Sequence, residues 1–515
     1  MSSPARRTVW IVPSLGDLVF LAVLAAALGG GSRMLSADGD PGRHLTVGKH
    51  IVESRSIPDR DIFSHTMAGQ PFVPYEWLSE VLSALSYQAA GPAGPVLLHG
   101  ALIAATFAVV FAHIRTRGSG GLMALAVSLL AMVVSAIHWL ARPHVFTFLG
   151  TAVFWSVLDL WRSGKLSARW LWILPGAMLF WSNIHGGFLV GLILLGAFIG
   201  AELLGIVSGN ESAMRWGRLR VLGPVAVATL VAGAITPVGG SLFVHVTGYL
   251  GKRLLVDRTI EYMSPNFHDA AMLPFMLMLV ATVAALAWSA RRPGLTEGLV
   301  VLVFVAFALY AGRNIPLFAI IAAPVLASQI EALPSVGGRV AEVIRAWARV
   351  RNSRIERMEQ SLGGHVWPIA ALIGATLVGV VQWQGGEPAP LGERFDPRLQ
   401  PVEAVAHLRT HPQTGNGFNE LGWGGYVLHG LWPWQRVFID GQTDFYGEPL
   451  VREYLQVVEL RPGWQQILDK YSVRWVLYGS DSSLVQTLTA TPGWRVEYRD
   501  TLATVLSRDG PAAAR

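Results

Sequence analysis

The sequence predicts an α-helical protein that crosses a membrane many times and carries a small α/β domain outside it. Of its 515 residues, 52% are hydrophobic and only 14% are charged, whereas soluble domains have about 25% charged residues. The apolar residues form long runs, and a run of about 20 crosses a bilayer core of about 30 Å as a helix. After a Pro- and Gly-rich stretch at 385–400, the composition becomes that of a soluble domain.

We expect about eleven transmembrane helices. The apolar runs are residues 14–34, 94–114, 120–138, 143–161, 169–184, 187–207, 221–238, 271–290, 297–312, 314–330 and 366–384. The first run follows a short basic flank and lacks a small-residue cleavage site, so we interpret it as a retained signal anchor. The absence of cysteine excludes disulfides, thiolate metal sites and a cysteine nucleophile.

Arginine and lysine lie in alternate loops between these runs, which is the pattern of cytoplasmic loops. These residues are Arg6 and Arg7, Arg115 and Arg117, Arg162, Lys165 and Arg169, Arg215, Arg218 and Arg220, Arg291 and Arg292, and those from Arg339 to Arg357. We therefore expect a cytoplasmic amino terminus and an extracytoplasmic carboxyl-terminal domain. Because the same loops account for the net charge of +6, we predict no nucleic-acid partner.

The predicted domains are a membrane domain at 1–384, a linker at 385–400 and an extracytoplasmic α/β domain at 401–515. Residues 331–365 form a basic amphipathic segment, which we expect to lie on anionic lipid headgroups at the cytoplasmic face. The outer domain should contain strands at 436–440, 473–478, 494–498 and 501–507, and helices at 401–410, 448–460 and 463–471.

The first outer loop, residues 35–93, is the longest polar stretch in the first 330 residues and carries seven carboxylates. A plain connection between two helices needs only about 4–6 residues. We therefore expect this loop to fold and to carry function, the alternative being a solvated connector.

Polar residues near helix ends gather on the predicted outer face, although each one alone could be a satisfied helix-end residue or a snorkelling arginine. Ionisable groups at the membrane edge are functional candidates. We predict catalytic roles for Asp38, Asp40 and Glu76. The candidates for donor or phosphate binding are Arg142, His144, Asn183, His185, Arg258, Arg313 and Asn314.

These residue types favour transfer chemistry with a lipid-linked phosphate. A carboxylate can act as a general base or, as for Asp38 and Asp40 together, hold a divalent cation. Arginine has a planar fork of donors that suits phosphate. Motifs for nucleotide binding, zinc proteolysis and serine hydrolysis are absent, and nucleotide sugars are not available outside the cell. A lipid carrier in the membrane is then the expected donor.

Asp40 is the predicted general base. Gly39, Pro41 and Gly42 around it disfavour a helix, so we expect Asp40 to project from a turn. Asp38 could share a cation with Asp40, or it could simply cap the next helix.

In the outer domain, Trp423, Tyr426 and Asp440 are the candidates for the acceptor side. Glycines beside Trp423 allow a close backbone approach, and Asp440 ends a predicted strand, where loops often carry sites. The alternative is a turn-rich edge of a purely structural domain.

Two segments resemble the GT-C superfamily of integral-membrane glycosyltransferases, which includes protein O-mannosyltransferases, aminoarabinose transferases and oligosaccharyltransferases. Residues 39–44, GDPGRH, stand where those families carry Asp–Glu, and residues 70–78, QPFVPYEWL, resemble their PPL-x-x-WL segment. The resemblance implies 8–13 helices, an acidic residue in a large first outer loop and often an outer domain. Pro41 departs from the pattern because it replaces the family's Glu.

Further motifs extend the resemblance. Trp423–Tyr426 and Asp440–Thr443 weakly resemble the WWDYG region of oligosaccharyltransferases, but the WWD is missing, so peptide-sequon binding is not supported. The chain is also similar to uncharacterised bacterial membrane proteins that carry D-x-x-x-H-L, P-x-x-D-x-F-S, R-P-H, N-x-H-G-G and A-x-R-N-I-P-L, all present here. The resemblance therefore places the protein in the cytoplasmic (inner) membrane of a bacterium.

We thus expect a glycosyltransferase that uses a polyprenyl-phosphate-linked sugar at the outer face, with an acceptor that the sequence does not identify. The alternative is a non-catalytic relative that serves envelope polysaccharide assembly or export. A transporter fits less well, since transport sites lie near the midplane. The enzyme hypothesis requires Asp38, Asp40, Arg142 and His185 to converge at the outer face.

Overall fold

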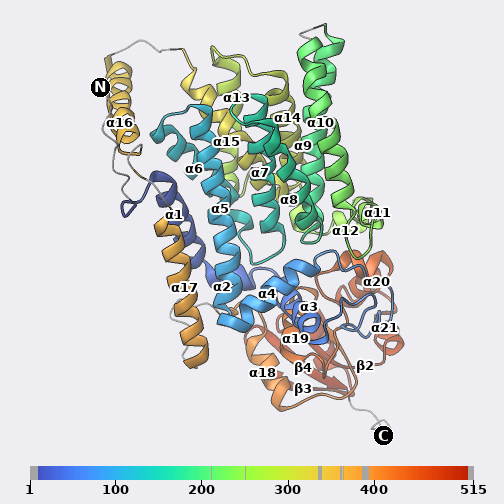
Figure 1. The fold of residues 1–515 in the computed structure, drawn as a ribbon. Coiled ribbons are helices and arrows are strands. Elements are labelled where there is room, and N and C mark those ends of the chain that lie inside the picture. The colour runs from blue at the N-terminus through green and yellow to red at the C-terminus, as the bar shows by residue number, and fades with distance from the viewer. Residues whose placement is uncertain are drawn as a thin grey trace, which may run out of the picture.

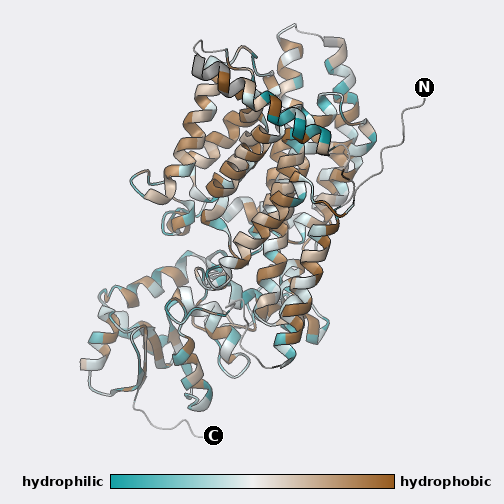
Figure 2. Ribbon diagram, turned by 90° about the vertical axis from the view of Figure 1, so that its left-hand side faces the viewer, coloured by the Kyte–Doolittle hydropathy of each residue, from teal (hydrophilic) through white to brown (hydrophobic). Residues whose placement is uncertain are grey.

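The computed structural model describes residues 10–209, 212–249, 251–334, 339–359, 362, 365–385 and 394–508. Apolar helices form one bundle, and the carboxyl-terminal domain packs against one end of it (Figure 1). In Figure 2 the bundle is mostly brown, so its residues are mainly hydrophobic, and the smaller domain is mixed.

The helices of the first part of the chain include most of the expected membrane segments. They are α1 Leu15–Gly29, α2 Gly31–Ser36, α3 Asp40–Ser54, α4 Trp77–Ala90, α5 Ala93–Arg117, α6 Gly121–Ser135, α7 His144–Arg162, α8 Ile173–Ser182, α9 Leu189–Val207, α10 Ser212–Gly233, α11 Ser241–Tyr249, α12 Arg253–Val256, α13 Leu273–Trp288, α14 Leu295–Tyr310, α15 Ile315–Glu331, α16 Arg339–Glu359 and α17 Val366–Gly385.

Seven helical stretches in the described residues are long and apolar enough to cross a membrane, and Leu15–Gly29 and Leu295–Tyr310 are shorter apolar helices. The two other predicted segments contain α8 and α10. Helix α8 has only 10 residues, about 15 Å of rise, and three arginines make the first half of α10 polar. The chain is a multi-pass membrane protein, while the number eleven stays a prediction.

Helix α15 lies at the centre of the bundle. Every residue from Ile315 to Gln329 is buried, and α5, α6, α7, α13 and α14 all contact this helix. Its alanines let neighbouring helices approach closely, because a small side chain separates the backbones least. Helix α17 lies at the periphery instead, since only 11% of its most apolar 18-residue stretch is buried.

The first outer loop folds into α3 and α4, which pack on each other. Our expectation that Asp40 projects from a turn is wrong, because Asp40 is the first residue of α3. Pro41 fits the first turn of a helix, where its fixed φ is suitable and its missing N–H is not needed.

The outer domain contains a four-stranded sheet in the order β1-β2-β4-β3. Strand β1 is parallel to β2, and β4 is antiparallel to both β2 and β3. The elements are β1 Asn416–Asn419, β2 Val473–Gly479, β3 Trp494–Arg499, β4 Ala503–Arg508, α18 Val402–Thr410, α19 Gly424–Leu431, α20 Thr443–Val458, α21 Trp464–Lys470 and α22 Ser483–Ala490.

Three predicted strands and all three predicted helices of this domain are found, but the strand predicted at 436–440 is wrong. That segment makes only an isolated bridge, from Val437 to Ser64 in the first outer loop. Its Val, Phe and Ile are buried at this contact between the two parts of the chain, which explains their strand-like pattern. Strand β1 was missed because Asn and Gly are poor strand formers.

Glycines hold the outer domain against α3. A side-chain carbon added at Gly39 would lie 2.1 Å from the carbonyl oxygen of Gly422, and one at Gly42 would lie 2.5 Å from that of Gly425. Only glycine permits this backbone-to-backbone contact. The outer domain therefore sits directly on the helix that begins with Asp40.

At the opposite end of the bundle, α16 packs beside α6 (Figure 1). The backbone N–H of Leu122 donates to Asn352 Oδ1 at 3.1 Å, and Arg115 pairs with Glu356 at 3.8 Å. Contact of the 331–365 segment with lipid headgroups stays a prediction. Parts of that segment, and residues 386–393 of the predicted linker, lie outside the described residues.

Candidate active site

Two carboxylates and an arginine meet where the bundle joins the outer domain. Arg142, between α6 and α7, places Nη1 at 2.7 Å from Asp38 Oδ2 and Nη2 at 2.6 Å from Asp40 Oδ2. Asp38 also accepts the backbone N–H of Asp40 at 2.9 Å. Asp38 therefore caps the start of α3 and shares a positively charged partner with Asp40.

Glu261 and Arg313 extend this cluster. One carboxylate oxygen of Glu261 lies 3.6 Å from Arg142 Nη1 and the other lies 3.4 Å from Arg313 Nη1. The Arg313 guanidinium also covers the ring of Tyr262 at 4.4 Å. Burial alone would raise the pKa of Glu261, but Arg313 and Arg142 outweigh burial and lower it below its usual range.

Glu261 was not among our predicted site residues. It lies on the outer stretch between α10 and α13, in a single 3₁₀ turn, Ile260–Tyr262. The only sequence feature that marks it is an acid beside an aromatic residue in a long outer connection, which is weak evidence. Its partners are 119 and 52 positions away in the numbering of the chain (261 minus 142, and 313 minus 261).

Glu76 lies behind the first cluster, between two histidines. Its carboxylate oxygens are 4.0 Å from His44 Nδ1 and 3.8 Å from His185 Nε2. Burial raises the pKa of Glu76 to about 7, although His44 acts against this rise. Glu80, which pairs with both Arg43 and His44 at 3.3 Å, fixes the position of His44.

The tautomer of His185 follows from its neighbours. The backbone N–H of Gly187 donates to His185 Nδ1 at 3.0 Å, so the proton of the neutral ring is on Nε2, which faces Glu76. Burial, with Arg313 and Arg142 nearby, lowers the pKa of His185 well below its usual value. His144 lies next to His185, with 6.5 Å between the two ring centroids. Its Nε2 is 2.8 Å from the carbonyl oxygen of His138.

The other predicted phosphate-binding residues do not join the cluster. Asn183 accepts from Trp77 Nε1 at 2.9 Å and donates to the carbonyl of Ile235 at 2.8 Å. Asn314 donates to the carbonyl of Phe307 at 3.0 Å. Arg258 pairs with Glu459 of the outer domain at 3.3 Å, on the surface.

The predicted acceptor-side residues make their contacts within the carboxyl-terminal part of the chain and with α3. Trp423 is buried and donates to the carbonyl of Leu399 at 3.1 Å. Tyr426 packs on Phe395 with ring centroids 4.8 Å apart. Asp440 is buried too, accepts from Tyr446 Oη at 3.0 Å and lies 3.4 Å from Arg43.

Gly441 brings the outer domain closest to Asp40. A side-chain carbon added at Gly441 would lie 1.8 Å from Asp40 Oδ1. The outer domain therefore limits the space around this carboxylate.

The residues that the sequence assigned to a metal already share a cation, the guanidinium of Arg142, which contacts both Asp38 and Asp40. Within the described ranges, no three His, Asp or Glu side chains are grouped so that they could hold a metal ion. The site in this arrangement does not fit a metal shared by the two aspartates. Metal dependence stays a prediction.

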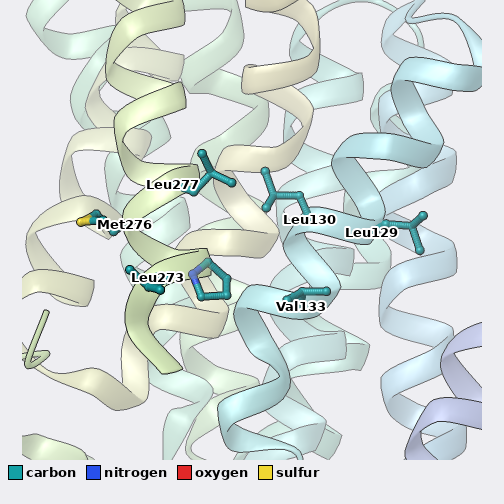
Figure 3. Close-up of a pocket in the computed structure, with 7 residues that line it drawn as sticks. Leu129, Leu130, Val133, Leu273, Met276 and Leu277 are labelled. Carbon is teal, nitrogen blue, oxygen red and sulfur yellow. The ribbon is translucent and has the colours of Figure 1, made fainter. Parts of the chain in front are cut away.

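An apolar groove runs between α6 and α13 (Figure 3). Its volume is about 600 Å³, and its lining residues are Leu129, Leu130, Val133, Leu273, Pro274, Met276 and Leu277. The chain continues from α6 to Arg142, and the stretch that carries Glu261 leads into α13. The groove and the charged cluster are therefore joined by short segments.

The structure combines a helical membrane bundle, a large folded first loop and a carboxyl-terminal domain packed on it. The apo oligosaccharyltransferase of Archaeoglobus fulgidus has a similar structure, with a TM-score of 0.58 at 10% identity over 89% of this chain and 69% of that one. AglB from the same organism, in complex with an inhibitory peptide and a dolichol-phosphate, gives a TM-score of 0.54 at 12% identity over the same shares.

Arabinofuranosyltransferase AftD from Mycobacteria matches with a TM-score of 0.49 at 14% identity, over 97% of this chain and 40% of that one. No protein-family model and no curated protein matches the chain. At identities this low the likeness shows the fold. The two archaeal structures confirm the GT-C resemblance at the level of the fold.

Proposed function

We propose that this protein is a glycosyltransferase that moves a sugar from a polyprenyl-phosphate-linked donor to an acceptor at the outer face of the cytoplasmic membrane. The observation that carries the proposal is the cluster in which Arg142 contacts Asp38 and Asp40 and is linked through Glu261 to Arg313. Arginine binds phosphate through its fork of donors, and a carboxylate can remove a proton from an acceptor hydroxyl.

The transfer needs one bond to form and one to break. The acceptor oxygen attacks the anomeric carbon of the sugar, and Asp40 takes the proton of that hydroxyl. The bond between the anomeric carbon and the phosphate oxygen breaks, and polyprenyl phosphate leaves. Arg142 and Arg313 stabilise the negative charge that develops on the leaving phosphate.

The groove supports a lipid carrier. Its seven lining residues are apolar, as a chain of isoprene units requires. It lies between α6, which is followed by Arg142, and α13, which is preceded by the stretch that carries Glu261. A protein of the same fold has been seen with a dolichol-phosphate, which is a polyprenyl phosphate. We place the lipid tail in the groove and the phosphate at the arginines.

The orientation is part of the proposal. With the amino terminus in the cytoplasm, the site and residues 401–515 face outward, where lipid-linked sugars are used. A fusion of alkaline phosphatase after residue 400 should be active, and a fusion near Arg349 in α16 should be inactive. The reverse pattern would move the site to the cytoplasm and contradict the proposal.

The activity test uses the purified full chain and a panel of polyprenyl-phosphate sugars, with products detected by mass spectrometry. Release of polyprenyl phosphate together with a glycosylated product supports the proposal, and an arm with a chelator tests the need for a metal. If no sugar is released from any donor, the alternative, a non-catalytic role in envelope polysaccharide assembly or export, is favoured.

A further inference from the structure

The Glu261 carboxylate lies between two guanidinium groups. Its oxygens are 3.6 Å from Arg142 and 3.4 Å from Arg313. Two oxygens of a phosphate can meet two arginines in the same way, because carboxylate and phosphate both accept from planar guanidinium donors. Glu261 therefore takes the position that a donor phosphate between these arginines would need.

This position can be reached from outside. The side chains of Arg142, Glu261 and Arg313 are 17%, 23% and 25% exposed. The Nε of Arg142 is buried and has no hydrogen-bond partner, so Glu261 and the aspartates do not use all the donors of this guanidinium.

The charges in the cluster favour replacement of Glu261 by the phosphate over binding of the phosphate beside Glu261. Three carboxylates, Asp38, Asp40 and Glu261, surround two guanidinium groups, which leaves one net negative charge. A phosphate that entered while Glu261 stayed in place would add another negative charge within a few ångströms of the carboxylates, and like charges this close repel. Departure of Glu261 removes its share of that repulsion and frees donors on both arginines.

Glu261 can leave without uncovering much of the core. Ile260 is 86% exposed and Met263 is 51% exposed, so the short turn is not packed on its outer side. The backbone carbonyl of Met263 accepts from the N–H of Gly312 at 2.9 Å, which anchors the segment next to Arg313. Tyr262 of the same turn packs on Arg313 and Tyr249, so the required movement is that of the Glu261 side chain and the exposed side of the turn.

We propose that Glu261 occupies the phosphate position of the empty site and that the lipid phosphate displaces it from between Arg142 and Arg313. This inference rests on the proposed function. It assigns Glu261 a second effect: after transfer, its return to the arginines competes with the polyprenyl phosphate product and promotes release. Glu261 thus weakens binding of the lipid phosphate and speeds turnover.

The test measures binding of polyprenyl phosphate, without sugar, to the full chain in lipid nanodiscs. Glu261→Gln should bind it about tenfold more tightly than the wild type, because the repulsion is removed and the competition is weakened. Phosphate-free polyprenol should bind equally well to both. Glu459→Gln is the matched control, because it removes one carboxylate from an exposed arginine pair nearby, and binding should not change.

Unchanged or weaker binding of polyprenyl phosphate by Glu261→Gln overturns the inference. An equal gain for polyprenol also overturns it, because the effect would then come from the lipid tail. Glu261→Ala gives the same decision if Glu261→Gln does not yield folded protein. A different result contradicts the proposed function instead: the wild type does not bind polyprenyl phosphate, and Arg313→Ala shows the same absence of binding.

Discussion

The two ends of the helical bundle both carry charged clusters, but the clusters differ in access. At the end away from the outer domain, Glu202 pairs with Arg162, Arg215 and Arg218 at 3.0–3.3 Å. The Glu202 side chain is only 1% exposed, although those of Arg162 and Arg218 are 20% and 24% exposed. At the other end the carboxylate itself can be reached, since the Asp38 side chain is 28% exposed.

A second group at the same end as Glu202 repeats this closed arrangement. Asp159 lies 2.8 Å from His113 and 3.1 Å from Arg117, and Arg117 also pairs with Glu297. The side chains of this group are at most 7% exposed. Ion pairs alone therefore do not mark a site. A cluster becomes a candidate site where a ligand can reach its carboxylates.

The largest effect should come from the reachable cluster. Asp40→Asn should retain expression and fold, because the amide is nearly isosteric, yet lose about 10²–10⁴-fold in turnover, because it cannot accept the proton. Release of polyprenyl phosphate from the sugar donor measures this. Near-normal turnover in Asp40→Asn, with Asp38→Asn or Glu76→Gln inactive, would move the role of the base to that residue.

The closed cluster should respond in stability. Glu202→Gln leaves three arginines without their buried carboxylate and should cost about 3 kcal/mol of stability, seen as a lower melting temperature in detergent. Turnover per folded molecule should stay near that of the wild type. A large loss of turnover with an unchanged melting temperature would contradict the structural role.

Glu76 should make stability depend on pH. Its folded pKa of about 7 is above the ordinary value of 4.5, so the folded state binds more protons between these values. Stability should therefore fall as pH rises from about 4.5 through 7, by an amount on the order of 3 kcal/mol. Melting temperatures across this range should show that Glu76→Gln loses this contribution. An identical pH slope in both proteins would remove Glu76 as its source.

The smallest effect separates two arginines on the same face. Arg313→Lys should raise the KM for the donor about tenfold, because a fork of donors becomes a point charge. Arg258→Lys should change it little, because Arg258 sits in an exposed pair with Glu459, and such pairs contribute about 0–1 kcal/mol. Equal effects of the two substitutions on KM would contradict the assignment of Arg313, and not Arg258, to phosphate binding.

The sequence by itself determined the membrane class and, as candidates, four of the five charged residues in the cluster around Arg142 and Arg313. A bilayer requires long apolar runs, and such runs are visible without any knowledge of contacts. The acids of the first outer loop, with Arg142 and Arg313 at helix ends, were identified because polar residues at a membrane edge are costly. The same local patterns identified three strands and three helices of the outer domain.

Only the tertiary structure decided which charges meet. Glu261 lies in the site and Arg258 lies outside it because each pairs with a residue more than 50 positions away. Glu261 pairs with Arg313, and Arg258 pairs with Glu459. The apolar 436–440 segment became a domain contact instead of a strand for the same reason. Sequence periodicity reports the neighbours of a residue along the chain, whereas the partner of a charge is set by distance in space.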